Sequence, residues 1–159
     1  MIFLTVGSMF PFDRLIRSVD ELVASGGMHG EITAQIGEGR YEPRSFPFVR
    51  FMDKPVFEKR SADATYLISH AGVGTISMAL RDGKPLLVIP RLSRFRESVN
   101  DHQLITARKF SELGHVLVAY ETSDIPSQFN ALRCFQPQAR RIQTDRLARR
   151  IGALLGSLR

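Results

Sequence analysis

The sequence predicts an α/β domain in which a doubly wound parallel sheet is covered by helices on both faces. Short apolar segments such as Leu86–Ile89 do not alternate with polar residues, which is typical of strands that are buried on both sides. These segments alternate along the chain with helical segments, in which apolar residues recur at three- and four-residue steps. A chain of 159 residues is long enough for one such domain with a substantial core.

The first half of the chain begins with a strand and a helix. Ile2–Val6 is continuously apolar and ends at Gly7-Ser8, which predicts a buried strand followed by a turn. Phe12–Ala24 has helical spacing of its apolar residues, and Gly26-Gly27 ends it. The other elements expected here are a strand at Glu31–Ile36, a turn-rich loop at Gly37–Pro47, a short strand at Phe48–Met52 and a short helix at Val56–Ala62.

The second half continues the alternation. A strand at Ala64–Ser69 leads through Gly72 and Gly74 into a helix at Thr75–Asp82. The segments expected next are a strand at Leu86–Ile89, a polar loop at Pro90–Val99, a helix at Asp101–Leu113, a strand at His115–Ala119, a short helix at Ile125–Leu132 and a long Arg-rich helix at Gln138–Leu158. We expect residues 1–159 to form a single domain that carries this basic helix at about 138–158.

The charge balance indicates an anionic partner. The net charge is +6 and the pI is about 10.1, and Arg supplies 18 of the 22 basic residues. Nucleic acid, an acidic membrane surface or phosphate groups would all suit this charge. The sequence has no nucleic-acid-binding motif, so we expect no nucleic-acid partner. The Leu and Ile residues of the helix at 138–158 form one stripe, so the helix can cover the sheet, dock on a partner or an anionic membrane, or do both.

Hydropathy and cysteine content favour a cytoplasmic protein. No apolar run approaches the ~20 residues that a membrane-spanning helix needs. The apolar N-terminus has no basic segment before it, so a buried strand explains it better than a signal peptide. The single cysteine, Cys134, is expected to be a partly buried structural thiol. No Cys/His cluster has the spacing of a zinc site, and we expect no metal or other cofactor.

Two turns after predicted strands carry the features of a phosphate site. Ligands of an open parallel sheet bind beyond the carboxyl ends of its strands. The first turn is Gly7-Ser8, which is either a tight turn or an anion-binding turn at a helix start. The second is Ser69–Ser77, where His70 is followed by two glycines and a helix start, an arrangement that stabilises a diphosphate. Its members of interest are His70, Gly72, Val73, Gly74 and Thr75.

The second turn also resembles a truncated dinucleotide-binding pattern. Ser77 replaces the third glycine of G-x-G-x-x-G, and the next strand ends at Pro90-Arg91 instead of an acid suited to a ribose. An NADP-binding oxidoreductase fragment therefore remains an alternative. The sequence contains no P-loop.

A third candidate is the tetrapeptide Asn100-Asp101-His102-Gln103 at the start of a predicted helix. Asn100 or Asp101 can cap the helix, in which case His102 and Gln103 are ordinary first-turn residues. Alternatively, the imidazole and amide groups hydrogen-bond sugar hydroxyls beside the cleft. Both interpretations fit the sequence.

Together these segments resemble the C-terminal domain of glycosyltransferase family 28. The resemblance rests on Ile68–Ile76, Gly83–Pro90 and Asn100–Gln103, in this order and at suitable spacing. The opening Phe3–Ser8 with Phe12–Leu15 resembles a narrower group, which contains the catalytic subunit of the two-subunit eukaryotic UDP-GlcNAc transferase and its bacterial exopolysaccharide (PssE-type) counterparts.

This resemblance implies one half of a GT-B glycosyltransferase, a Rossmann-like domain that binds a UDP-sugar. The acceptor half would be a separate, membrane-anchored subunit that binds a lipid-linked acceptor. The chain would then act in polysaccharide biosynthesis, cytoplasmic and held at the inner face of the membrane through that partner. A non-catalytic sugar-nucleotide-binding or assembly subunit is the alternative from another class.

The resemblance also implies roles for individual residues. Gly7 and Ser8 match the first phosphate-side turn, and the stretch Gly72, Val73, Gly74 and Thr75 matches the loop whose amides meet the diphosphate. His70 matches a position near the nucleotide, and His102 and Gln103 match contacts to donor-sugar hydroxyls, beside Asn100 and Asp101. The chain departs from many relatives at Met78, where they carry a Glu that holds the ribose. A thioether is a poor hydrogen-bond acceptor.

The expected chemistry is inverting transfer without a metal ion. The sequence has no D-x-D segment of the kind that holds a divalent cation, so amides and helix dipoles would stabilise the leaving diphosphate. The general base must reach the acceptor hydroxyl, and we expect it on the partner subunit. His70 and His102 would only assist.

Overall fold

A six-stranded parallel sheet forms the centre of the structure. The computed structural model describes residues 1–139, and within them the strands are β1 (Ile2–Thr5), β2 (Ile32–Gln35), β3 (Phe48–Val49), β4 (Tyr66–His70), β5 (Leu86–Ile89) and β6 (Leu117–Val118). Their order across the sheet is β3-β2-β1-β4-β5-β6, and every neighbouring pair is parallel. This is the strand order of the Rossmann fold, in which the chain winds outward in both directions from β1.

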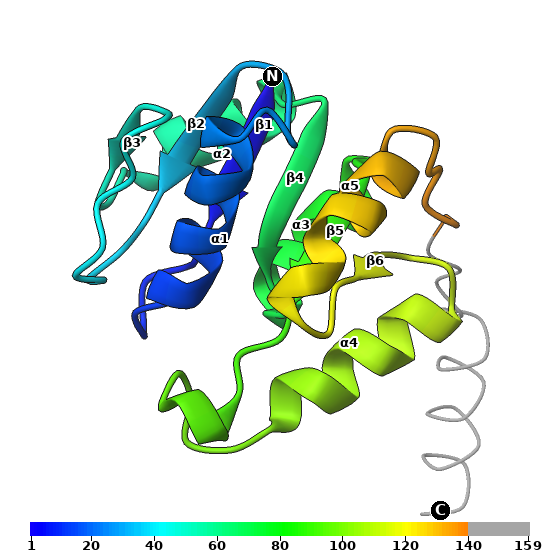
Figure 1. Ribbon diagram of the computed structural model, residues 1–159. Coiled ribbons are helices and arrows are strands. Elements are labelled where there is room, and N and C mark those ends of the chain that lie inside the picture. Colours follow the sequence, from blue (N-terminus) through cyan, green and yellow to red (C-terminus); the bar gives the residue numbers. More distant parts are fainter. Residues whose placement is uncertain (140–159) are drawn as a thin grey trace, which may run out of the picture.

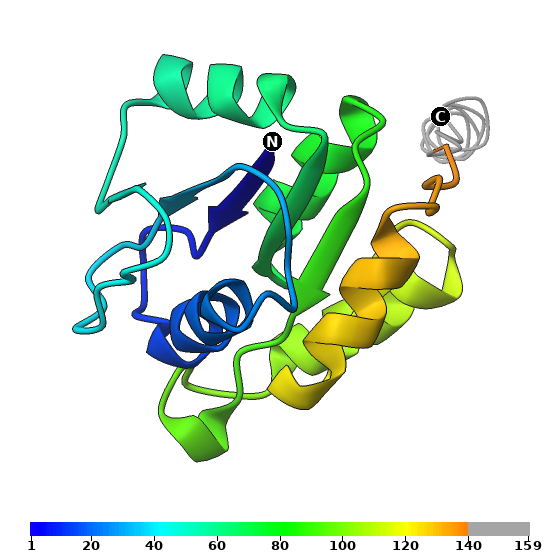
Figure 2. The same ribbon diagram turned by 45° about the horizontal axis from the view of Figure 1, so that its top comes forward.

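Five α-helices of the described part cover both faces of the sheet (Figure 1). They are α1 (Asp13–Ala24), α2 (Lys54–Asp63), α3 (Val73–Arg81), α4 (His102–Glu112) and α5 (Ile125–Leu132), with short 3-10 helices η1 (Ser93–Phe95) and η2 (Thr122–Asp124). Figure 2 shows the sheet between α2 on one side and α1 and α5 on the other. The predicted doubly wound α/β architecture is confirmed.

Two apolar clusters explain why helices are needed on both faces. Side chains of one strand point alternately to opposite faces, so Ile2 and Leu4 join the cluster under α1 and α5, whereas Phe3 joins the other. The second cluster receives Ile76 of α3 and Ala107 of α4. Because both faces are buried, the strands read as continuous apolar runs.

Several predicted boundaries require correction. The strands expected at Phe48–Met52 and His115–Ala119 are confined to two residues each, and the helix expected at Val56–Ala62 begins at Lys54. Pro55 is accommodated in its first turn, where no intrahelical N–H bond is made. The predicted loop at Pro90–Val99 contains η1. The helix predicted at Gln138–Leu158 lies almost wholly outside the described residues.

The prediction for Cys134 is wrong, because its thiol is exposed. The residue follows α5, where the chain turns away from the sheet. No helix among residues 1–139 has the length and apolar content to cross a bilayer.

Candidate functional site

The two predicted phosphate turns lie next to each other at the carboxyl edge of the sheet. β1 pairs directly with β4, and Thr5 stands opposite Ser69 in the register. After β1 the chain continues to β2 on one side, whereas after β4 it continues to β5 on the other. Their carboxyl ends therefore flank the topological switch point, the usual ligand position in this fold. Gly7 and Ser8 follow β1, and Gly72 follows β4.

The His70 ring lies between the two glycine turns. A methyl group added at Gly72 would lie 2.3 Å from His70 Nε2, and one added at Gly7 would lie 2.8 Å from His70 Cε1. Gly7 also has a φ of +72°, which favours glycine. Both glycines are therefore needed to make room for the imidazole. The sequence predicts that Gly72 allows a ligand to approach the backbone closely, and the structure adds that Gly72 makes room for the His70 ring.

His70 is a neutral hydrogen-bond acceptor at physiological pH. Burial lowers the pKa of His70 to about 4, helped by the charge of Arg91 and opposed by hydrogen bonding to the Thr5 carbonyl. The Ser69 hydroxyl donates to the Thr5 carbonyl at 2.8 Å, so its oxygen is left to accept from His70 Nδ1 at 3.1 Å. This arrangement assigns the proton to Nδ1 and leaves the lone pair of Nε2 for a ligand.

The start of α3 presents free backbone amides beside His70. Within residues 1–139, the amides of Val73, Gly74 and Thr75 have no hydrogen-bond partner outside the helix, and the first turn of a helix offers them none inside it. A methyl group added at Gly74 would meet nothing within 4 Å. Gly74 thus faces open space, where an anion can approach the positive end of the helix dipole.

Arg91 links the turn after β1 to the end of β5. Its guanidinium is almost fully buried and donates to the carbonyls of Val6 at 2.6 Å and Phe10 at 2.5 Å. Its backbone N–H donates to Gln103 Oε1 at 3.0 Å. Gln103 therefore shares this edge of the sheet with Gly7. Its carbonyl oxygen is used within the protein, which leaves its NH₂ group for a ligand.

A partly buried ion pair fixes the loop between β5 and α4. Arg14 of α1 contacts both carboxylate oxygens of Glu97, each at 2.8 Å, and the Leu92 amide donates to the same carboxylate at 3.1 Å. The Glu97 side chain is only 8% exposed. The sequence analysis missed Arg14, Arg91 and Glu97. The one available signal was Glu97 as the lone acid of an arginine-rich loop.

The start of α4 combines capping with exposed polar groups. The Asn100 side chain accepts from the His102 amide at 3.1 Å, and Asp101 accepts from the Ser93 amide at 2.7 Å. That hydrogen bond to Ser93 lowers the pKa of Asp101. The capping interpretation thus holds for Asn100, whereas Asp101 fastens the preceding loop. The His102 side chain is exposed.

Met78 packs against the apolar cluster that contains α3. Its side chain is partly buried there, so the departure from the family pattern is accommodated by packing.

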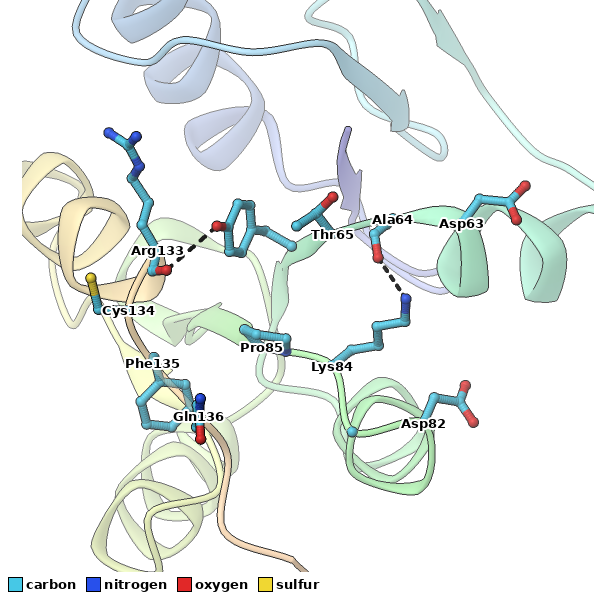
Figure 3. A pocket seen from close by; sticks show the side chains of 12 residues that line it. Asp63, Ala64, Thr65, Asp82, Lys84, Pro85, Arg133, Cys134, Phe135 and Gln136 are labelled. Atoms are coloured by element: carbon cyan, nitrogen blue, oxygen red, sulfur yellow. Dashed lines mark hydrogen bonds between the residues drawn. The ribbon is translucent and has the colours of Figure 1, made fainter.

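A cavity lies at the opposite edge of the sheet (Figure 3). Its volume is about 590 Å³, and its lining includes Thr65 and Pro85, which precede β4 and β5. Lys84 donates to the Ala64 carbonyl at 2.8 Å, so its charge is partly used by the backbone. The amino ends of the strands do not offer the helix starts that bind anions, and we place the candidate site at the carboxyl edge.

Replacing Gly72 by Ala is expected to lower the free energy of unfolding by about 2 kcal/mol, because the new methyl group overpacks the site against His70. Chemical denaturation of the single variants and of the His70→Ala/Gly72→Ala double variant measures this. In the His70→Ala background the Gly72 substitution should cost almost nothing. An equal cost in both backgrounds contradicts the steric explanation.

Comparison with known proteins identifies a matching family and similar sequences. Residues 1–144 match the model of the glycosyltransferase family 28 C-terminal domain. The chain is 32% identical over 125 residues to the human (Homo sapiens) UDP-N-acetylglucosamine transferase subunit ALG13, and 29% identical over 124 residues to its mouse (Mus musculus) counterpart. These matches cover 72% of the chain but only 10% of each relative.

Solved structures share the fold. The NMR structure of ALG13 superposes with a TM-score of 0.59 at 20% identity, covering 94% of this chain and 93% of that one. The crystal structure of Acinetobacter baumannii MurG superposes with a TM-score of 0.55 at 19% identity, and the match covers 83% of this chain and 40% of MurG. The glycotransferase of kitacinnamycin superposes with a TM-score of 0.59 at 20% identity, and the match covers 82% of this chain and 33% of that protein. The Rossmann-like fold class is confirmed, and the partial coverage of the last two is as expected for one half of a GT-B transferase.

Proposed function

The chain belongs to the glycosyltransferase family 28 C-terminal domains, and from this premise we propose that it is the donor-binding subunit of an inverting, UDP-sugar-dependent glycosyltransferase. One observation carries the proposal: the first amides of α3 have no partner outside the helix within residues 1–139, and Gly74 faces open space in the turn that follows the neutral His70. The human relative is a UDP-N-acetylglucosamine transferase subunit, which supports a UDP-sugar as donor.

In this proposal the diphosphate lies on the amides of Val73, Gly74 and Thr75. These donors and the dipole of α3 stabilise the charge that develops as the sugar leaves, without a need for a metal ion. Arg91 adds positive charge close to His70. His70 Nε2 accepts a hydrogen bond from an O–H or N–H group of the donor, because the pKa of about 4 keeps the ring neutral. His70 thus binds and orients, and is not a proton donor at pH 7.

The remaining donor contacts are proposed for the loop ends around this edge. Gly7 and Ser8 complete the phosphate side, and the exposed His102 and the NH₂ group of Gln103 contact sugar hydroxyls. Hydrogen bonds to individual hydroxyls discriminate strongly between sugars.

A separate acceptor-binding subunit is proposed to cover the carboxyl edge. The loops there expose large apolar side chains, namely Met9, Phe10, Phe95 and Val99, and Val99 is 85% exposed. Such a group is typical of a protein contact surface. We propose that this partner is membrane-anchored, supplies the general base, and binds a lipid-linked acceptor of polysaccharide biosynthesis. The chain would then lie at the cytoplasmic face of the membrane.

Replacing Gly74 by Ala tests the donor site. The added methyl group points into open space, so the ligand-free protein should be at least as stable as the parent. Better helix propensity should raise its free energy of unfolding by up to about 0.5–1 kcal/mol. The affinity for UDP should fall about tenfold or more, because the methyl group blocks the approach of the diphosphate. Isothermal titration calorimetry measures the affinities for UDP and for NADP as a second ligand, and a thermal melt measures the stability of the ligand-free protein.

Unchanged UDP affinity in the Gly74→Ala variant would refute the proposed diphosphate position. Binding of NADP but not UDP would favour the oxidoreductase alternative. Arg91 does not distinguish the two ligands, since its guanidinium is buried against main-chain carbonyls and adds only its positive charge.

A non-catalytic sugar-nucleotide-binding subunit is the second candidate. Met78 favours it, because a packed thioether does not replace a ribose-binding acid. UDP binding without transfer in the presence of the acceptor subunit would distinguish this candidate.

A further inference from the structure

A second basic pocket lies away from the switch point, between α1 and the loop that joins β2 to β3. Figure 1 shows this loop beside α1. The pocket has a volume of about 620 Å³. It is lined by Arg17, Arg40, Tyr41, Glu42, Pro43, Arg44 and Phe48, and we call it the arginine pocket.

Carboxylates of α1 hold the loop of the arginine pocket in place. Asp20 is 5% exposed and accepts from the Tyr41 hydroxyl at 2.7 Å and from the Ser45 and Arg44 amides at 2.8 and 3.0 Å. Asp13 accepts from the Arg40 amide at 3.0 Å. The main chain around the arginines is therefore fixed before any ligand binds, which reduces the entropic cost of binding.

The three guanidinium groups of the pocket are not paired with a carboxylate in the described part of the chain. Within residues 1–139, no Asp or Glu lies within salt-bridge distance of Arg17, Arg40 or Arg44. The Arg17 guanidinium lies over the Tyr41 ring, 4.3 Å from its centre. Arg17 is thus oriented by an uncharged group and keeps its donors for a ligand.

The acidic residues nearby do not compensate this charge directly. Glu42 contacts Arg50 at 2.6 Å, and the Asp20 carboxylate is used by a hydroxyl and two amides. The three arginine side chains are exposed, and several guanidinium groups without a carboxylate partner among residues 1–139 can donate to phosphate oxygens.

We propose that the arginine pocket binds a phosphate group, either that of an anionic lipid headgroup or that of a soluble phosphate compound. The three arginines donate to the phosphate oxygens, and the Asp20 and Asp13 hydrogen bonds position the loop. This site is distinct from the amides of α3, and it does not depend on the proposed transferase function.

The test compares two triple variants of the full chain that change its charge equally. Arg17→Gln/Arg40→Gln/Arg44→Gln removes the pocket cations, and Lys54→Gln/Lys59→Gln/Arg60→Gln removes three exposed cations of α2. Binding is measured by calorimetry with inorganic phosphate, and by flotation with vesicles of phosphatidylglycerol in phosphatidylcholine. Thermal melts confirm that both variants are folded.

We expect the pocket variant to weaken binding at least tenfold in one arm, and the α2 variant to change it less than twofold. The arm that responds identifies the source of the phosphate. The pocket variant should keep the affinity of the parent for UDP, which separates this site from the proposed donor site.

Equal losses in the two triple variants would show a general charge effect and would overturn the proposal. Absence of binding by the parent in both arms would overturn it as well. Replacing the same arginines by Lys should restore only part of the affinity, because an ammonium lacks the planar fork of a guanidinium.

Discussion

Replacing Glu97 by Ala is expected to lower the free energy of unfolding by about 3 kcal/mol. The change removes both contacts to the partly buried Arg14 and leaves the Leu92 amide without its acceptor. A charge that remains in a largely buried position without its partner accounts for most of the cost. For a chain of this size the melting temperature should fall by about 6–12 °C. Thermal and urea denaturation measure the two quantities.

The matched control is Asp63→Asn, which breaks the exposed Lys59–Asp63 pair of α2. Exposed pairs of this kind contribute about 0–1 kcal/mol, so this variant should melt within about 4 °C of the parent. A Glu97→Ala variant as stable as the control would mean that the ion pair does not hold the loop. Arg14→Met/Glu97→Leu, which removes both charges together, should be less destabilised than Glu97→Ala.

Stability should fall as the pH is lowered from about 6.5 to about 4, because His70 resists protonation in the folded state. Its pKa is about 4 when folded and about 6.5 when unfolded, so between these values the unfolded chain binds the proton more readily. The contribution of neutral His70 to the free energy of unfolding is therefore complete above pH 6.5 and is lost as the pH falls to about 4. Its full size is about 3 kcal/mol.

His70→Asn provides the test, because Asn does not titrate. The variant starts less stable, but its free energy of unfolding should change much less between pH 6.5 and 4 than that of the parent. A parent-like loss in the variant would show that another group causes the dependence.

Asp20→Asn tests a second pH dependence of stability, which lies at lower pH than that of His70. Burial raises the pKa of Asp20, but the hydrogen bonds from Tyr41, Ser45 and Arg44 outweigh this effect and lower it below its ordinary value of 3.8. Its contribution is therefore present above about pH 4 and is lost below it. This variant should keep the loss between pH 6.5 and 4 that the His70→Asn variant removes.

The order of elements was predicted from the sequence alone, and so was the edge of the sheet at which we place the candidate site. Apolar runs such as Leu86–Ile89 are strands because a sheet buried on both faces tolerates no polar alternation. Strand-to-helix turns such as Gly7-Ser8 and Gly72–Thr75 predict the ligand edge, because carboxyl ends of parallel strands share one side. These are local signals, readable from neighbouring residues.

Only the tertiary structure decided which residues meet there. Arg14 and Glu97 are 83 positions apart, and Arg91 donates to the Val6 carbonyl 85 positions away. No local sequence pattern predicts either contact. Likewise, Gly72 makes room for the His70 ring, which lies between two turns that only strand pairing brings together. Sequence patterns fix elements through local periodicity, whereas a buried charge finds its partner by packing across the whole domain.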